Sequence, residues 1–158
     1  MIDATIIRAH QDSSRISEKE IQGLGRSRGG LTSKIHLIVD ALGLPIDFSV
    51  TGGDRHDITQ ANELLKSKQS IYVIGDKGYD SNDFREMITA SGRSAVIPPR
   101  TCRKTPIHHD VALYKERHLV ELCFCKLKEF RRIGTRYDKT KKMFSALVTI
   151  ACILLWLK

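Results

Sequence analysis

The sequence lacks several features that would narrow its class at once. It has no internal repeat, no long low-complexity linker and, at Met1–Gln11, no apolar core of the kind found in signal peptides. Its longest apolar run, Ala146–Leu157, holds 12 residues including Thr149, well short of the roughly 20 that a transmembrane helix needs. No membrane partner is therefore expected. The four cysteines follow no signal peptide, so reduced thiols in a cytosol are expected.

What the sequence does have is a strong and uneven positive charge. Its 158 residues carry a formal net charge of +8 with 41% hydrophobic content, which suits one domain with a single core. Between Arg100 and Lys142 there are 13 Lys or Arg against 5 Asp or Glu, whereas the rest of the chain holds 13 of each. Such concentrated charge is typical of a surface that binds a polyanion, and it also fits a surface that only keeps the protein soluble.

Hydrophobic periodicity predicts strands first and then an alternation of strands and helices. Strands are predicted near Ile2–Ala9, at Ile35–Val39 and Pro45–Val50 as a hairpin with Gly43 in its turn, at Ile71–Ile74 as a short buried strand, and at Ser94–Ile97. Helices are predicted after Asp57, at Asn82–Ala90, over Tyr114–Phe130 and over Lys141–Leu157. This order indicates an α/β fold with a mixed sheet flanked by helices.

The stretch 10–30 is rich in Ser, Gly and charge and is predicted to be a loop or flexible insert. Asp54, His56 and Asp57 follow two glycines and form a metal-like cluster, but a turn with Asp57 as helix N-cap explains them more simply. In the C-terminal helix, four apolar residues at helical spacing are predicted to form the buried face: Leu147, Ile150, Leu154 and Leu157.

Four polar residues near the C-terminal third share one regular spacing. Arg117, Glu121 and Lys128 follow Tyr114 at offsets of 3, 7 and 14 residues. On a helix that turns by about 100° per residue, all four fall within about 60° of one another. One carboxylate would then lie among three groups suited to phosphate, on a stripe that faces a cleft. An ordinary solvated helix face explains the same spacing.

Two further acids lie on or beside predicted strands. Asp3 belongs to the first strand, and Asp76 follows the apolar run that ends at Gly75. Acids from three elements can converge, and Mg²⁺ prefers such oxygen ligands. Two divalent ions about 3.5–4 Å apart can drive in-line cleavage of a phosphodiester. Each acid also has a simpler interpretation: Asp3 as a frayed terminus, Asp76 as a turn residue, and Glu121 as an ion-pair partner of Arg117.

Six segments closely resemble bacterial insertion-sequence transposases of the DDE type, and the resemblance runs nearly end to end. It includes both aspartates in order and the signature Tyr-x2-Arg-x3-Glu-x6-Lys. The segments are Asp3–His10, Gly25–His36, Asp76–Ser81, Ile97–Arg100, Tyr114–Lys128 and Arg131–Lys139. The resemblance implies a ribonuclease H-like core. It also implies an enzyme of DNA transposition that cleaves phosphodiesters at transposon ends and transfers the strand to target DNA.

Carried over position by position, the resemblance implies that Asp3, Asp76 and Glu121 form the catalytic, metal-binding triad. The implied cofactor is Mg²⁺, for which Mn²⁺ can substitute. Seven residues are expected to contact DNA: Tyr114, Arg117, Lys128, Arg131, Arg132, Arg26 and Arg28.

The chief departure from the family pattern lies before Asp3, which only Met1 and Ile2 precede. Relatives carry an upstream region expected to bind the DNA ends, so this module is expected to be absent. The first strand is expected to be too short to pair fully in the sheet. The chain is then either the downstream product of a split reading frame or a decayed fragment. Expected partners are transposon-end and target DNA, and either further copies of the chain or an upstream reading-frame product, in the cytoplasm at the nucleoid.

Three functions therefore stay open at this stage. The leading one is a single catalytic domain over residues 1–158 for metal-dependent cleavage and strand transfer. The second is a catalytically inactive, truncated transposase that only binds DNA or inhibits a complete transposase. The third is a structure-selective nuclease with the same core but no strand transfer.

Overall fold

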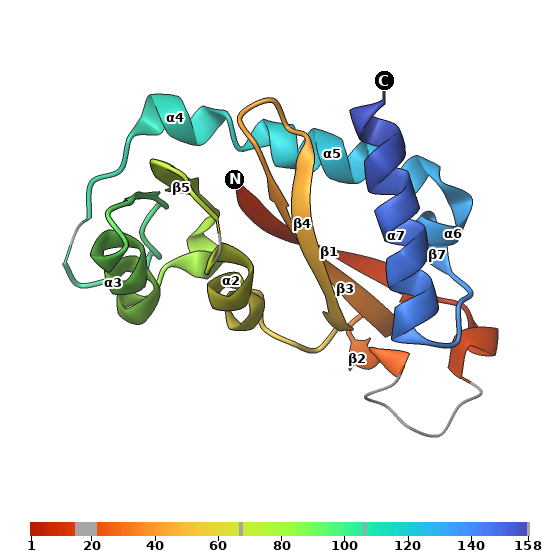
Figure 1. Cartoon of the computed structure of the whole chain (residues 1–158). Coiled ribbons are helices and arrows are strands. Elements are labelled where there is room, and N and C mark those ends of the chain that lie inside the picture. The colour runs from red at the N-terminus through yellow and green to blue at the C-terminus, as the bar shows by residue number, and fades with distance from the viewer. Residues whose placement is uncertain (15–21, 67, 106, 158) are drawn as a thin grey trace.

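Figure 1 shows the computed structural model of the chain, which describes residues 1–14, 22–66, 68–105 and 107–157. A curled five-stranded sheet lies at the centre, and a two-stranded sheet lies beside it. Helices flank the central sheet, which contains both antiparallel and parallel pairs. This architecture confirms the predicted α/β fold with a mixed sheet and is consistent with a ribonuclease H-like core. No helix among the described residues is long and apolar enough to cross a lipid bilayer.

The central sheet has the order β2-β3-β1-β7, with β4 on β3. Its strands are β1 (Ile2–Ala9), β2 (Gly25–Ser27), β3 (Gly30–Val39), β4 (Pro45–Gly52) and β7 (Thr135–Arg136). The antiparallel pairing of β1 with β3 runs from Ile2 opposite Ile38 to Arg8 opposite Thr32. The first strand was predicted to pair incompletely. On the edge that faces β3 this prediction is wrong, because the pairing of β1 begins at Ile2. On its other edge, β1 pairs with β7 only at Arg8 and Ala9.

The hairpin of β3 and β4 confirms the sequence prediction, and Gly43 has the positive φ of 79° that its turn requires. The predicted insert at 10–30 is wrong in part. It contains a 3-10 helix, η1 (Gln11–Ser14), and β2, which forms a tight hairpin with β3. The φ of 92° at Gly30 permits that turn, which periodicity could not reveal in so short a strand. Residues 15–21 of the predicted insert lie outside the described part of the chain.

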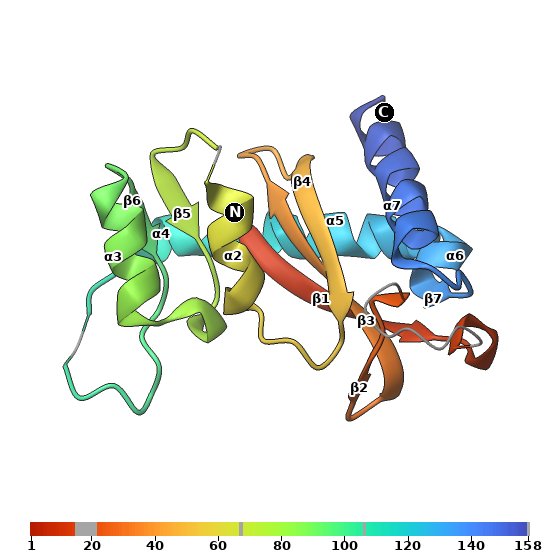
Figure 2. The same cartoon turned by 60° about the horizontal axis from the view of Figure 1, so that its bottom comes forward.

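Two apolar cores lie on opposite faces of the central sheet. On one face, α5 (His118–Glu129), α6 (Arg131–Gly134) and α7 (Lys141–Trp156) supply Phe124, Ile133 and Phe144 against β-strand residues such as Leu37. On the other, α2 (Ile58–Leu65) and α3 (Asn82–Ala90) pack around Ile2 and the small sheet. Figure 2 shows the two groups of helices on either side of β1. Alternation along β1 therefore directs Asp3 toward the α5 side.

The buried face of α7 differs from the predicted one. The side chains that enter the core are Phe144, Val148, Ala151 and Leu155. Ile150, Leu154 and Leu157 are 55%, 40% and 76% exposed. Apolar residues lie on almost every side of this helix, so more than one of its faces shows helical spacing of apolar residues. The position of the sheet decides which of these faces is buried.

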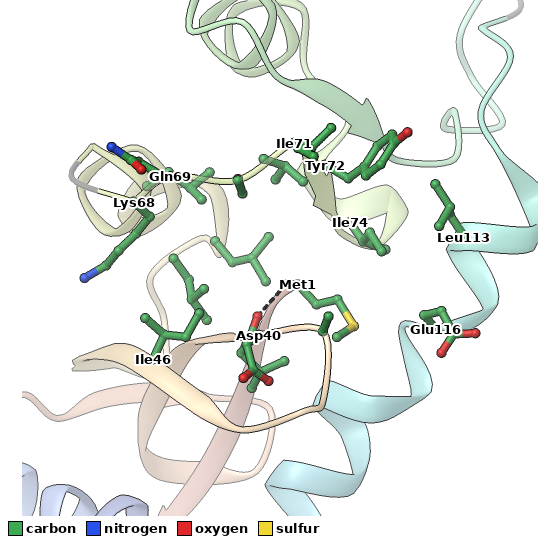
Figure 3. A pocket seen from close by; sticks show the side chains of 17 residues that line it. Met1, Asp40, Ile46, Lys68, Gln69, Ile71, Tyr72, Ile74, Leu113 and Glu116 are labelled. Atoms are coloured by element: carbon green, nitrogen blue, oxygen red, sulfur yellow. Dashed lines mark hydrogen bonds between the residues drawn. The ribbon is translucent and has the colours of Figure 1, made fainter. Parts of the chain in front are cut away.

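The small sheet consists of β5 (Tyr72–Ile74) and β6 (Ser94–Val96), which pair in parallel. The start of the predicted buried strand is wrong, because Ile71 is 74% exposed. Between β5 and the β3–β4 turn lies an apolar groove of about 380 Å³, into which Met1, Ile46 and Ile74 project (Figure 3). This groove lies between the outer part of β5 and the central sheet, and Gly75 lies close to Ile2.

The predicted helix over Tyr114–Phe130 forms as two helices with a short break. The first, α4 (Val111–Lys115), begins at Asp110, whose carboxylate accepts the backbone N–H groups of Ala112 and Leu113. Arg117 stands at the junction, in the N-cap position of α5. In the predicted α3, Ser81 caps the start, and Gly92 follows the end with a φ of 74°.

Candidate active site

Arg117 joins two of the three acids that the sequence singled out. Its Nη2 donates to Asp3 Oδ2 at 2.9 Å, and its Nη1 donates to a carboxylate oxygen of Glu121. Arg117 can reach both because it lies one helical turn before Glu121 on α5, which packs against β1. One guanidinium thus draws together acids from a strand and a helix that lie 118 positions apart in the sequence.

Asp76 reaches the same region from the end of β5. Its Oδ1 accepts the backbone N–H of Gly78 at 2.7 Å and caps the short 3-10 helix η2 (Lys77–Tyr79). Gly75 lies next to Ile2, since a Cβ atom at Gly75 would lie 3.4 Å from Cγ2 of Ile2. Asp76 is close enough to Asp3 for its negative charge to raise the pKa of Asp3. Asp76 Oδ2 accepts no hydrogen bond from any described residue.

The electrostatics of Asp3 are governed mainly by its burial. Burial, with smaller contributions from the negative charges of Asp76 and Asp57, raises the pKa of Asp3 to about 6. The backbone N–H of Ala4 and the guanidinium of Arg117 act in the opposite direction. A cation beside Asp3 would offset part of the free-energy cost of burying its charged form.

The three carboxylates are suitable ligands for a divalent metal ion, but their side chains do not lie close enough together to share one. Asp3, Asp76 and Glu121 offer carboxylate oxygens, which Mg²⁺ and Mn²⁺ prefer. Nowhere in the described residues do three acidic, histidine or cysteine side chains lie close enough to share one ion. The Glu121 carboxylate, whose side chain is 54% exposed, is turned to Arg117 instead.

Asp57 behaves differently from the sequence prediction. It occupies the N-cap position of α2, but its carboxylate makes no capping hydrogen bond. It instead accepts from Lys34 Nζ at 2.7 Å, and its charge acts on Asp3, His36 and Tyr79. The interpretation of Asp57 as a capping residue is therefore wrong, because a buried lysine stem on β3 competes for it. Sequence spacing gave no signal of this long-range pair.

Two buried polar groups near the acids lack partners. The Tyr79 side chain is fully buried, and its hydroxyl has no hydrogen-bond partner among the described residues. Burial raises the pKa of Tyr79, and the charges of Asp3, Asp57 and Asp76 raise it further. The Nε of Arg117 is likewise buried without a partner. Polar groups of this kind cluster where a structure is built for a ligand or a reaction rather than for stability alone.

The four residues predicted to share one helix face lie on two helices, and only two of them are joined by a side-chain hydrogen bond. Arg117 and Glu121 meet, whereas Tyr114 lies on α4 and packs edge-on against His109. Lys128 is exposed two turns beyond Glu121, roughly 10 Å along α5. Arg131 is exposed at the start of α6, and Arg132 binds Asp138. Arg117 is thus bound to acids here rather than presented as a free phosphate ligand.

The structure does not bring Arg26 and Arg28 to the acids. Both are exposed at the β2–β3 hairpin, which lies beside the far end of β1. Arg8 marks that end, and it is five residues from Asp3, or roughly 17 Å along an extended strand. The two arginines therefore belong to a different part of the surface from the candidate active site.

Comparison with known proteins shows the family to which a chain with these acids belongs. A family model described as "Transposase DDE domain" matches residues 1–156. The chain belongs to the DDE transposase family. Its acids on β1, after β5 and on α5 are the candidates for the acidic residues after which this family is named, and DNA transposition is the process in which the family acts.

Two curated relatives support the assignment of this DDE transposase chain. A protein of Brucella ovis named as a transposase for insertion sequence element IS6501 is 38% identical over 130 residues, which cover 81% of this chain and 100% of that protein. A protein of Burkholderia cepacia named as a transposase for insertion sequence element IS402 is 30% identical over 142 residues. That alignment covers 82% of this chain and 64% of the relative. No solved structure matches the chain.

Proposed function

We propose that residues 1–158 form a catalytic domain that cleaves phosphodiesters at transposon ends and transfers the freed strand to target DNA. Asp3, Asp76 and Glu121 are its proposed catalytic, metal-binding residues. The observation that carries this proposal is the bridge from Arg117 to Asp3 and Glu121, beside the free Oδ2 of Asp76. The bridge joins the acids of β1 and α5, and the charge of Asp76, in the turn after β5, acts on Asp3.

Each acid has a defined part in this chemistry. Asp3 Oδ2, Asp76 Oδ2 and the Glu121 carboxylate would hold Mg²⁺ or Mn²⁺, which when bound would activate the attacking oxygen and neutralise charge at the phosphorus. The hydrogen bond from Gly78 N–H fixes the carboxylate plane of Asp76. Arg117 orients Asp3, and Glu121 would exchange its bond to Arg117 for the metal ion.

The test is nicking of supercoiled plasmid by the purified chain with Mg²⁺ or Mn²⁺, compared with Asp76→Asn and a chelator control. An asparagine oxygen can still accept from Gly78 N–H, so the turn should persist while metal-dependent nicking falls below detection. Asp83→Asn, an exposed acid on α3, is the matched control and should nick normally. Undiminished nicking by Asp76→Asn would rule out the proposed role of this acid.

The other two functions give different results in the same assay. An inactive, truncated transposase would bind DNA without nicking it and would suppress a complete transposase when mixed with it. The separation of the acids in the metal-free chain is the observation that favours this alternative. A structure-selective nuclease would nick DNA but would fail to join a pre-cut end with a free 3′ hydroxyl to target DNA.

The proposed partners follow from this chemistry. Transposon-end and target DNA are the substrates, because the basic excess between Arg100 and Lys142 includes α5. Joining two DNA ends requires an assembly, so we propose that the chain acts with further copies of itself or with an upstream reading-frame product. The bacterial nucleoid is the proposed place of action.

A further inference from the structure

A second polar site adjoins Asp76 on the side of the loop that follows β6. A cavity of about 320 Å³ opens between the turn after β5 and this loop. The residues that line it are Asp76, Lys77, Gly78, Arg100, Thr101 and Cys102. It therefore combines one proposed catalytic acid with two cations and two small polar side chains. None of the residues expected from the sequence to bind DNA lines it.

Arg100 is held in a defined orientation at this cavity. Its Nε donates to the carbonyl oxygen of Lys77 at 3.1 Å, and its Nη2 donates to that of Gly78 at 2.7 Å. These carbonyls belong to the turn that Asp76 caps, so the guanidinium is anchored next to the proposed active site. Its Nη1 has no partner among the described residues and remains available to a ligand.

A buried acid holds the loop that carries Arg100. The Asp80 side chain is 1% exposed and accepts from Arg85 Nε at 2.7 Å and from Arg103 Nη2 at 2.8 Å. It also accepts the backbone N–H of Arg100 at 2.8 Å. Although burial alone would raise the pKa of Asp80, the hydrogen bonds from Arg103, Arg100 and Arg85 hold it well below its usual range. The loop is thus anchored independently of any ligand.

The resulting charge pattern suits an anion next to Asp76. Asp80 carries one negative charge against the two arginines that bind its side chain. At the cavity itself, Lys77 and Arg100 supply two positive charges against the one negative charge of Asp76. A cation fixed before binding loses less side-chain entropy than a free surface lysine when it meets a phosphate. Guanidinium groups also match the geometry of phosphate oxygens.

We propose that Arg100, with Lys77, forms a binding site for one backbone phosphate of DNA beside the phosphate that the Asp76 region would cleave. This inference rests on the proposed function, since it takes DNA as the ligand and Asp76 as its neighbour. It adds a positioning site that sets which phosphate reaches the acids. Arg100 acts on the DNA backbone and not on the reacting atoms.

Arg93 provides a matched control for Arg100. It also donates to two backbone carbonyls, those of Leu65 and Lys68, and its substitution removes the same unit of charge. It lies beyond α3 rather than at the cavity, since none of its contacts involves the residues around Asp76. Arg93→Gln therefore controls for lost backbone contacts and for the change in net charge.

The experiment measures binding of a short fluorescent DNA duplex without divalent metal, at several salt concentrations. Arg100→Gln should weaken binding and lower the slope of log affinity against log salt by about one, because one phosphate contact contributes roughly 0.9. Arg93→Gln should leave the slope unchanged. Equal slopes for Arg100→Gln and the unmodified chain would overturn the inference. Because no cleavage is measured, an inactive chain would not affect this result.

A second measurement identifies the phosphate itself. Single phosphates of the duplex are replaced by uncharged methylphosphonates, one position at a time. One position should weaken binding by the unmodified chain several-fold and should weaken binding by Arg100→Gln clearly less, because only Lys77 still contacts that phosphate. If every sensitive position weakens binding by both proteins equally, Arg100 has no phosphate of its own and the inference fails. Melting temperatures of Arg100→Gln and Arg93→Gln show whether either variant has lost its fold.

Discussion

At the scale of single residues, the acids of the candidate site are paired with a few basic side chains. Arg117 neutralises part of the charge on Asp3 and Glu121, and Lys34 does the same for Asp57. Neither arrangement satisfies every buried polar atom, since Arg117 Nε and the Tyr79 hydroxyl stay without partners among the described residues. The cluster therefore costs stability that a purely structural cluster would not.

Tyr79→Phe should raise the stability of the metal-free chain. The substitution removes a buried hydroxyl that has no partner within the described structure, while the ring keeps its contacts with Gly75 and Phe84. The expected gain in the free energy of unfolding is about 1 kcal/mol. Chemical denaturation measures it. A loss of stability would mean that the hydroxyl is hydrogen-bonded in solution, for example to an ordered water.

His36 should make stability depend on pH. Burial lowers the pKa of His36 from its ordinary value of 6.5 to about 4, so the folded chain binds the proton less tightly than the unfolded chain. The stability contributed by neutral His36 is present above about pH 6.5 and is lost as the pH falls toward about 4. The loss is at most about 3 kcal/mol.

The measurement compares denaturation curves of the unmodified chain and His36→Gln across this range. Glutamine can keep the hydrogen bond that His36 Nε2 shares with Thr51 but cannot titrate. Asp3 titrates in the same range with the opposite sign, and its contribution cancels in the difference between the two proteins. A difference that does not change with pH would show that His36 is not buried as described.

At the scale of elements, α7 and α5 cover the same face of the central sheet but bury different kinds of surface. α5 has a narrow apolar face and leaves its polar side to the acids. α7 is apolar almost all round, so part of its surface stays exposed. The orientation of α7 about its axis is therefore a property of packing and not of composition.

Two neighbouring leucines of α7 test that orientation. Leu155 is 8% exposed and belongs to the core, whereas Leu154 is 40% exposed. Leu155→Ala should cost about 2–4 kcal/mol in the free energy of unfolding because it leaves a cavity. Leu154→Ala should cost less than about 1 kcal/mol. Denaturation midpoints measure both, and the reverse order would mean that the helix buries the face predicted from its sequence.

At the scale of the whole molecule, the excess of positive charge is confined to one stretch of the chain, and the rest of the chain carries equal numbers of basic and acidic residues. The excess of Lys and Arg lies between Arg100 and Lys142, which span the loop after β6, α4, α5 and α6. Within this stretch, Arg117 before α5 binds Asp3, and the loop after β6 lies beside Asp76. The charge distribution thus favours approach of a polyanion to the candidate active site.

The affinity for non-specific DNA should fall at least roughly tenfold between low and physiological salt. Lys128→Gln, in the basic stretch, should reduce this salt dependence, because Lys128 is exposed beside the proposed DNA path. Lys66→Gln makes the same change directly after α2, where the lysine pairs with Glu63, and should have little effect. Fluorescence anisotropy measures both variants. Equal effects would show that the net charge of the chain matters and its location does not.

The sequence by itself determined the element types, the family and the order of the three acids. Strand alternation, helical period and turn residues act over a few positions, so β1, the β3–β4 hairpin and α3 could be predicted from local chemistry. The signature from Tyr114 to Lys128 likewise gave the correct pairing of Arg117 with Glu121, since residues one turn apart meet on any helix.

Only the tertiary structure decided how distant segments share charge. The bridge from Arg117 to Asp3, the ion pair of Lys34 with Asp57 and the anchoring of Arg100 on the turn after Asp76 all join separate elements. No local period encodes such contacts, because they depend on how the helices pack on the sheet. The buried face of α7 was decided in the same way, since its sequence offered several apolar faces and the core accepts one.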